Sequence, residues 1–213
     1  QTLGALQDFG GHGQRVVEGQ RLMQAASDLF LGWAEGKRGR QFYVRQLRDM
    51  KVKPLVEAFD RMGGIAYIFL THEDDVADAA RYARRFGAKR IIHRADAHAM
   101  PDAEVIIDGS HAQSYGDMFE IIPVPGHTAG SLCLLYRNRF LFTGDHLWWD
   151  PETTELNAPQ QLVSDAEALR RSIVSLTSYS FEWVLAGHGG RIHLSQQGMR
   201  AALDDLILRR QQV

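Results

Sequence analysis

Apolar and polar positions change their spacing along this chain, and the change comes near residue 54. Before that point, apolar residues recur at helical spacing from Val17 to Trp33, with Gln, Arg and Asp between them, so we expect a helix there. The following segment, Phe42–Met50, fits either a strand or a helix. We therefore predict a helical amino-terminal segment over residues 1–53.

From residue 54 onward, short apolar runs bounded by turn residues alternate with amphipathic segments. The runs predict strands and the amphipathic segments predict helices. The expected strands are Ile65–Leu70, Arg90–His93, Val105–Asp108, Phe119–Val124, Ser131–Tyr136, Phe140–Thr143 and Trp183–Ala186. The expected helices are Pro54–Met62, Asp74–Phe86, Gln160–Leu176 and Ser195–Leu208. This alternation, with hairpins mixed in, predicts an α/β layered domain over residues 54–213.

The composition of this 213-residue chain argues against several classes of function. Lys and Arg number 24 and Asp and Glu number 26, and the resulting charge of −2 argues against binding to nucleic acid or to a membrane surface. No apolar run approaches the length of about 20 residues that a membrane helix needs. The single cysteine, Cys133, excludes an internal disulfide and a Cys-rich zinc site, and it fits a reducing, cytoplasmic location.

Four metal-capable side chains stand at similar places in the predicted architecture. His72, Asp145 and His188 each follow an apolar strand, and His127 lies in a glycine-bracketed turn between two strands. Loops at strand ends can converge while the sheet stays rigid, and His with Asp suits zinc, iron or manganese. One such histidine alone is usually a structural residue. Four such elements in one chain favour a metal site.

These elements carry a resemblance to the metallo-β-lactamase-fold superfamily, over about residues 54–212. The motifs are P-G-H-T-A-G-S at Pro125–Ser131, F-T-G-D-H-L-W-W at Phe142–Trp149 and A-G-H-G at Ala186–Gly189. A fourth, F-L-T-H-x-D-D-V-A-D at Phe69–Asp78, is similar to a bacterial and plastid branch of the superfamily. The resemblance implies an αββα sandwich with mixed sheets.

The resemblance also implies roles for individual residues. His127 would bind a first metal, Asp145 would bridge or bind from the side, and His188 would serve a second metal. His72 matches the first histidine of the superfamily motif H-x-H-x-D-H. The implied metal ligands are His72, Asp74, His127, Asp145 and His188, with Asp145 and His188 also acting in catalysis.

The first metal motif departs from the superfamily pattern. In an ungapped comparison, Asp74 replaces the second histidine, Val76 the aspartate and Ala77 the last histidine. A gapped comparison makes Asp78 the aspartate but still leaves Ala79 at the histidine position. Since the second metal position loses ligands either way, we expect one divalent ion, zinc, with iron or manganese as alternatives. His188 then becomes a hydrogen-bond donor behind the ligands or a proton shuttle.

The function implied by the resemblance is hydrolysis of a small ester, thioester or lactone by a metal-bound water. The alternative is a non-catalytic relative that binds a ligand or partner with an incomplete metal site. A third option is an oxidoreductase accessory or di-iron protein, which the missing ligands disfavour. A small-molecule substrate is the expected partner.

The amino-terminal segment belongs to a different pattern. Residues 11–53 are similar to a fragment of an unrelated bacterial family with no established function and a kinase-like fold, so we expect a boundary near Lys53 and Pro54. Strands that normally precede the first histidine motif would then be replaced by a helical segment. A sheet left incomplete needs cover, which makes a homodimer an expectation.

Three residues near the motifs, His146, Trp148 and Trp149, leave alternatives open. His146 either supports Asp145 or lies at the surface. Trp148 and Trp149 either line a substrate cleft or pack in the core. Cys133 lies in an apolar strand and is expected to be an inert core thiol.

Overall fold

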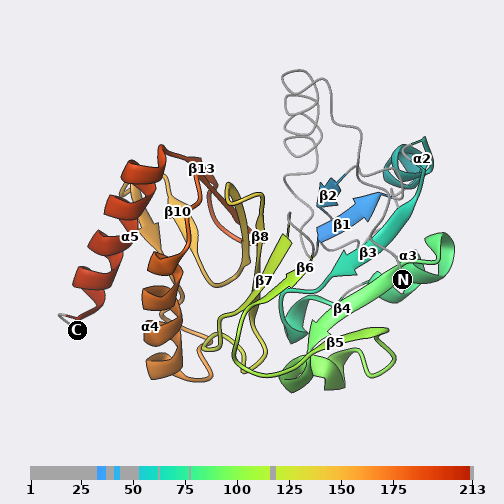
Figure 1. Cartoon of the computed structure of the whole chain (residues 1–213), viewed down its shortest axis with the longest axis horizontal. Helices are drawn as coiled ribbons and strands as arrows, with labels where there is room; N and C mark the ends of the chain where they lie inside the picture. The colour runs from blue at the N-terminus through green and yellow to red at the C-terminus, as the bar shows by residue number, and fades with distance from the viewer. Residues whose placement is uncertain are drawn as a thin grey trace. The chain divides into compact units, whose positions relative to one another are not determined.

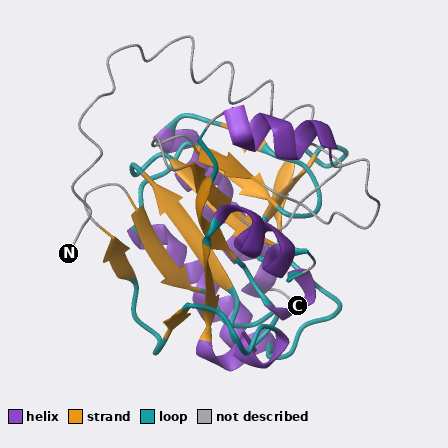
Figure 2. Ribbon diagram, turned by 90° about the vertical axis from the view of Figure 1, so that its right-hand side faces the viewer, coloured by secondary structure: helices purple, strands orange, loops and turns teal. Residues whose placement is uncertain are grey.

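The computed structural model describes residues 33–36, 41–43, 53–61, 63–76, 78–115 and 119–211. This part of the chain forms both strands and helices, and the strands β5 (Val105–Ile107) to β11 (Glu155–Asn157) follow one another without a helix between them (Figures 1 and 2). The predicted α/β class with mixed sheets is confirmed. Two compact units result: unit 1 holds the described residues up to Leu70 with Asp74–Ile91 and Asp102–Val105, and unit 2 holds Thr71–Glu73, Ile92–Pro101 and the residues from Ile106 onward.

A five-stranded sheet organises unit 1. In this sheet β1 (Trp33–Gly36) pairs antiparallel with both β2 (Gln41–Tyr43) and β3 (Ile65–Phe69), whereas β3 and β4 (Lys89–His93) are parallel. In spatial order the strands are β2 (Gln41–Tyr43), β1 (Trp33–Gly36), β3 (Ile65–Phe69), β4 (Lys89–His93) and β5 (Val105–Ile107). Among the described residues of this unit, the helices are α2 (Lys53–Arg61) and α3 (Ala79–Phe86).

Aromatic side chains join α2 and α3. Phe59 of α2 meets Tyr82 and Phe86 of α3 edge-on, with ring centroids 6.1 Å and 5.9 Å apart. All three rings are buried, which matches the amphipathic pattern of these helices. Helix α3 ends at Gly87, whose left-handed φ of 64° suits glycine and whose backbone N–H donates to the Ala83 carbonyl.

The prediction that a helical segment replaces the amino-terminal strands needs correcting at two places. Residues Trp33–Gly36 and Gln41–Tyr43 form an antiparallel hairpin, and β1 pairs with the edge of β3. The physical reason is that the N–H and C=O groups along an open edge of β3 need partners, and a hairpin supplies them. The rest of the helix predicted from Val17, and residues 44–50, lie outside the described residues.

A six-stranded sheet organises unit 2. Strands β12 and β9 are parallel, and the other neighbours are antiparallel. In spatial order the strands are β13 (Ile192–His193), β12 (Trp183–Ala186), β9 (Phe140–Gly144), β8 (Leu132–Tyr136), β7 (Phe119–Pro123) and β6 (Gln113–Tyr115). A separate hairpin pairs β10 (Trp148–Asp150) with β11 (Glu155–Asn157). The short helices in the described residues are η1 (Glu73–Asp75), η2 (Arg94–Ala99) and η3 (Leu176–Ser178).

Two helices cover one face of this sheet. They are α4 (Ala166–Ser175) and α5 (Gln196–Gln211), which lie side by side in Figure 1. Alternate residues of β8, including Cys133 and Leu135, pack with Leu169 of α4 and Leu203 of α5 in one apolar core. Cys133 is fully buried, so the prediction of a core thiol is confirmed. Among the described residues, no helix is both long and apolar enough to cross a membrane.

Candidate metal centre

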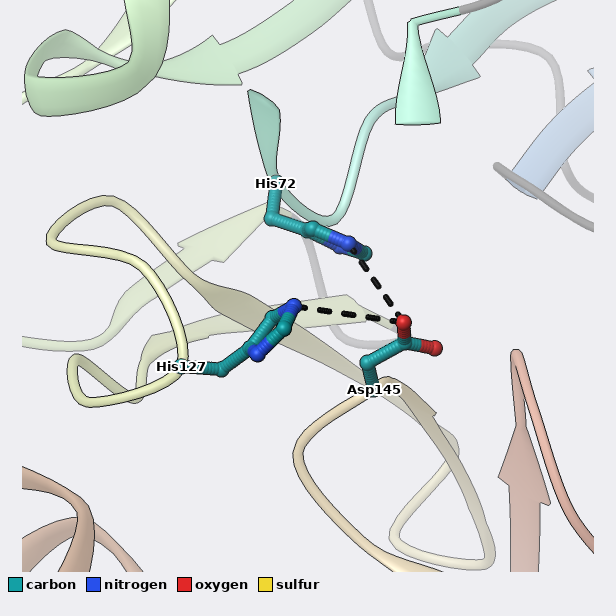
Figure 3. Close-up of side chains that lie close together, drawn as sticks. All are labelled: His72, His127 and Asp145. Atoms are coloured by element: carbon teal, nitrogen blue, oxygen red, sulfur yellow. Dashed lines mark ion pairs between the residues drawn. The ribbon is translucent and has the colours of Figure 1, made fainter. Parts of the chain in front are cut away.

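Three predicted ligands come together in unit 2. His72 precedes η1, His127 lies in the loop between β7 and β8, and Asp145 follows β9. Their ligand atoms all lie within 4.8 Å of one another. Figure 3 shows both imidazoles pointing toward the carboxylate: Nε2 of His72 lies 3.6 Å and Nε2 of His127 3.9 Å from Oδ2 of Asp145.

Oxygen atoms on the far side of each ring fix the orientation of both imidazoles. Nδ1 of His127 lies 2.7 Å from the carbonyl oxygen of Leu162, so this nitrogen carries the proton and donates it. Nδ1 of His72 lies 2.9 Å from the hydroxyl of Thr71. Both contacts leave Nε2 as the nitrogen that faces Asp145. A hydrogen bond at the other ring nitrogen is the usual support of a metal-binding histidine.

His188 contacts Asp145 rather than joining the three-residue cluster. Its Nδ1 lies 2.7 Å and 2.8 Å from the two carboxylate oxygens and donates to them, since a carboxylate can only accept. Burial alone would raise the pKa of Asp145, but the His188 hydrogen bond and the nearby imidazoles outweigh it and hold that pKa below its ordinary value. The geometry thus matches the role of His188 as a donor behind the ligands.

Glycine next to His188 leaves room for the carboxylate. The backbone N–H of Gly187 donates to the Gly144 carbonyl at 2.6 Å, which holds the loop after β12 against the loop after β9. A Cβ atom at position 187 would lie 2.8 Å from Oδ1 of Asp145. Any side chain there would therefore push the carboxylate out of place, which gives the A-G-H-G motif a steric reason.

Asp74 was predicted to be a metal ligand, but it does not belong to the cluster of His72, His127 and Asp145. It is exposed on η1, and the ion-holding cluster found among the described residues does not include it. Val76 is half-buried, and Ala77 lies outside the described residues. A role for Asp74 in binding an ion remains a prediction.

The donor set fits one divalent ion. Two imidazole nitrogens and one carboxylate oxygen are ligands that zinc, iron and manganese accept. Bonds of about 2.0–2.2 Å in a tetrahedral site place ligand atoms about 3.3–3.6 Å apart. The separation of 3.6 Å from His72 to Asp145 lies in that range, the separation of 3.9 Å from His127 lies just above it, and all three ligand atoms lie within 4.8 Å of one another. His72 is 1% exposed and the His127 side chain 9%, so an ion there would be shielded from bulk water.

The structure decides between the alternatives for His146 and for Trp149, which both lie in the motif at Phe142–Trp149. His146 is 1% exposed, which excludes the surface alternative, and burial, with His127 and Arg210 nearby, lowers its pKa to about 3. Trp149 packs against the apolar core of unit 2. Trp148 lies against Gly189, where a Cβ atom would come within 2.5 Å of its ring.

Sequence reasoning missed one buried polar residue beside the site. Asp96 of η2 is 1% exposed, and its carboxylate accepts hydrogen bonds from Glu73, Thr128 and Gly130. Glu73 follows His72 directly, and the other two follow His127. The signal in the sequence was the T-A-G-S stretch after His127, whose N–H and hydroxyl donors need a buried acceptor once the loop is packed.

Solved structures resemble the fold of this chain at low sequence identity. BLEG-1 B3 metallo-β-lactamase superimposes with a TM-score of 0.59 and 19% identity, over 73% of this chain and 84% of that one. The di-iron-bound form of TTHA1623 superimposes with a TM-score of 0.55 and 21% identity, over 78% of this chain and 90% of that one. The chain has the metallo-β-lactamase fold. The predicted superfamily resemblance is confirmed at the level of the fold.

Curated relatives match part of the chain. A hydroxyacylglutathione hydrolase of Acidiphilium cryptum (strain JF-5) is 32% identical over 97 residues, which are 44% of this chain and 40% of that protein. Another, of Anaeromyxobacter dehalogenans (strain 2CP-C), is 38% identical over 79 residues, or 37% of this chain and 30% of that protein. The chain thus spans less than half the length of these relatives.

One family model matches the amino-terminal side. It is described as "Uncharacterized protein conserved in bacteria (DUF2252)" and matches residues 4–106. The match includes residues 11–53 and runs on through His72. It therefore extends beyond the boundary predicted near Lys53, and that boundary remains a prediction.

Proposed function

We propose that this chain is a metal-dependent hydrolase of a small thioester, with an ester or lactone as related substrates. The observation that carries the proposal is the convergence of His72, His127 and Asp145 with both Nε2 atoms facing one carboxylate oxygen. The curated relatives are hydroxyacylglutathione hydrolases, whose named substrate is a thioester. These partial matches support the reaction class and do not determine which acyl group the substrate carries.

One ion, zinc, is the proposed cofactor, and iron or manganese would accept the same ligands. A divalent ion in this position supplies a Lewis acid that lowers the pKa of water and polarises an acyl carbonyl. His72 and His127 would bind through Nε2, while Leu162 and Thr71 keep the rings turned toward the ion. Their burial keeps bulk water away, which strengthens charge interactions inside the site.

His188 has the position of a proton carrier. Its Nδ1 donates to Asp145, and its side chain is 47% exposed, so the ring connects the carboxylate with solvent. A histidine in that place can deliver a proton to the leaving thiolate or take one from water. Asp145 also fixes the tautomer of His188, because its carboxylate accepts the hydrogen bond from Nδ1 and so keeps the proton on that nitrogen.

Metal analysis of the purified protein, paired with a thioester hydrolysis assay, tests the proposal. We expect about one ion per chain, loss of turnover with a chelator, and a decrease in kcat/KM of at least about 100-fold in His127→Ala together with loss of the ion. His111→Ala, which removes an exposed histidine, is the matched control and should keep both. Equal metal content in His127→Ala and the wild type would refute the ligand assignment.

A non-catalytic binding module is the second candidate. It is favoured by Asp74 and Val76, which stand where the superfamily pattern has ligands and lie outside the three-residue cluster. Hydrolysis panels with zinc, iron and manganese separate the candidates. Turnover that a chelator abolishes excludes the binding module, and bound metal without turnover on any thioester, ester or lactone supports it.

Three further expectations go with the proposal. A small-molecule substrate, rather than nucleic acid or a membrane, agrees with the charge of −2. A cytoplasmic location agrees with a single buried thiol. A homodimer would cover sheet edges and is tested by light scattering.

A further inference from the structure

We propose that Asp96 is a positioning residue whose carboxylate ties the loop of His72 to the loop of His127 and thereby sets the spacing of the two imidazoles. The inference rests on the metal centre of the proposed function and assigns that centre a residue outside the superfamily motifs discussed above. Asp96 touches neither imidazole, so it would act through the backbone that carries them.

The contacts of Asp96 reach both loops at once. Oδ2 accepts the backbone N–H of Glu73 at 3.0 Å, and Glu73 is the residue after His72. The same oxygen accepts the Thr128 hydroxyl at 2.6 Å, and Oδ1 accepts the backbone N–H of Gly130 at 2.8 Å. One rigid carboxylate of three atoms thus joins two loops that lie more than 50 residues apart in the sequence.

The residue before His72 is tied to the same loop. The carbonyl of Thr71 accepts the backbone N–H of Leu132 at 2.8 Å. His72 therefore stands between two anchored neighbours, Thr71 and Glu73, and both anchors lead to the stretch that follows His127. Both ties join the loops that carry the imidazoles, and the Asp96 tie is the one made by a side chain.

Neutral donors alone compensate the charge of Asp96. Among the described residues, no Lys, Arg or His forms an ion pair with it, although it is 1% exposed. Burying a carboxylate without a cation is costly unless hydrogen bonds satisfy its oxygens. A residue that served packing alone would not need this charge. The carboxylate supplies instead two oxygens that accept from two loops in one plane.

The loop after His127 is built around this carboxylate. The Ser131 hydroxyl lies 2.8 Å from Oγ1 of Thr128 and accepts the Thr128 backbone N–H at 3.0 Å, so the Thr128 hydroxyl is free to donate to Asp96. At Gly130 an added Cβ would lie 2.5 Å from Oδ1 of Asp96. The absence of a side chain there allows the close approach of the N–H.

The test replaces Asp96 by Asn, which keeps the shape and loses one acceptor. In metal-free protein, the readouts are amide exchange at Glu73 and Gly130 and the side-chain nitrogen signals of His72 and His127. With cobalt(II) added, the readouts are the dissociation constant and the visible spectrum. We expect exchange at least about 10-fold faster, displaced imidazole signals, and a dissociation constant raised about 10-fold to 100-fold.

Matched variants separate positioning from general stability. Asp108→Asn removes an exposed carboxylate that pairs with Arg94 and should leave every readout unchanged. Thr128→Val removes one donor to Asp96 and should weaken cobalt binding severalfold, and Thr128→Ser should restore it. A purely structural role would lower the melting temperature and leave the cobalt spectrum of the folded fraction unchanged.

Each outcome decides the inference. Folded Asp96→Asn protein with the wild-type cobalt spectrum and dissociation constant overturns it. If that variant does not fold, Thr128→Val decides, and cobalt affinity equal to that of Thr128→Ser overturns the inference. If the wild type binds no cobalt, the proposed metal centre fails, whereas displaced imidazole signals in Asp96→Asn still support the positioning role and unchanged signals overturn it.

Discussion

Two buried charges lie six residues apart in the sequence and are compensated in opposite ways. The Arg90 side chain, on β4 in unit 1, is 6% exposed and donates to Glu104 at 2.7 Å and 3.0 Å and to Asp102 at 3.1 Å. Asp96, on η2 in unit 2, is 1% exposed, and its partners among the described residues are two backbone N–H groups and a hydroxyl. One charge is matched by opposite charges, and the other by dipoles.

The two buried charges, Arg90 and Asp96, therefore serve different purposes. The partners of Arg90 lie in one segment after β4, so its network holds unit 1 together locally. The partners of Asp96 belong to the loops that carry His72 and His127, so its hydrogen bonds set the geometry of a site. Charge-assisted hydrogen bonds are strong in both cases, but only the second set reaches the candidate ligands.

The largest effect is expected for Asp96→Ala. This change leaves two backbone N–H groups and one hydroxyl buried without their acceptor, and each costs about 1–3 kcal/mol. We expect the free energy of unfolding of unit 2 to fall by about 3–5 kcal/mol, measured by urea denaturation with amide exchange in β8. A loss below about 1 kcal/mol would mean that water replaces the carboxylate, and the comparison with Arg90 would lose its basis.

Arg90→Met should cost less, about 2–3 kcal/mol in the stability of unit 1. The reason is that the Glu104 and Asp102 side chains are 39% and 72% exposed and can be hydrated once the guanidinium is gone. Metal binding should stay at the wild-type level. Arg94→Met, which removes an exposed arginine, is the control and should cost no more than about 1 kcal/mol. A cobalt affinity that falls in Arg90→Met would contradict the division of roles.

Acid should weaken the Arg90 network through Glu104. The hydrogen bond from Arg90 holds the pKa of Glu104 at about 2, below its ordinary value of 4.5. Because the folded-state value is the lower one, this contribution to stability is complete above pH 4.5 and is lost as the pH falls toward 2. Solvent screening limits it to about 1 kcal/mol. Urea midpoints between pH 6 and pH 2.5 should decline less steeply in Glu104→Gln, and an identical slope would refute the assignment.

The smallest effect is expected at the exposed partner of Glu73. His98 lies 2.8 Å from the Glu73 carboxylate, and its side chain is 71% exposed. His98→Ala should change the free energy of unfolding by less than about 0.5 kcal/mol and leave cobalt affinity unchanged. This variant separates the two contacts of Glu73, since it removes the contact with His98 and leaves the hydrogen bond to Asp96 in place. A strong loss of affinity would shift the positioning role from Asp96 to His98.

Local pattern was enough to find the ligands but not the residue that spaces them. His72, His127 and Asp145 stand beside strand ends and glycines, and these features are visible in a short window of sequence. Asp96 stands in R-A-D-A-H, which is typical of an exposed polar segment. Its burial depends on a loop that lies more than 30 residues later, and the donors of the T-A-G-S stretch in that loop indicate that a buried acceptor is needed without indicating which residue it is.

The difference between local and long-range information also explains which strands could be predicted from the sequence. The apolar run Ile65–Leu70 predicted β3 because a buried strand carries its signal in its own residues. Strand β1, by contrast, exists through pairing with β3 across about 30 residues, and the helical spacing that ends at Trp33 concealed it. The hairpin of β10 and β11 was missed for a related reason, since short strands with mixed polarity are defined by their partners.

The position of Cys133 gives the chain a built-in chemical reporter. It is the one cysteine in the sequence, it is fully buried in β8, and burial raises the pKa of its thiol. A thiol-reactive dye can label it only while this part of unit 2 is open, so the labelling rate counts opening events without an introduced probe. Replacements at Asp96 should speed labelling, and those at Arg90 should leave it slow.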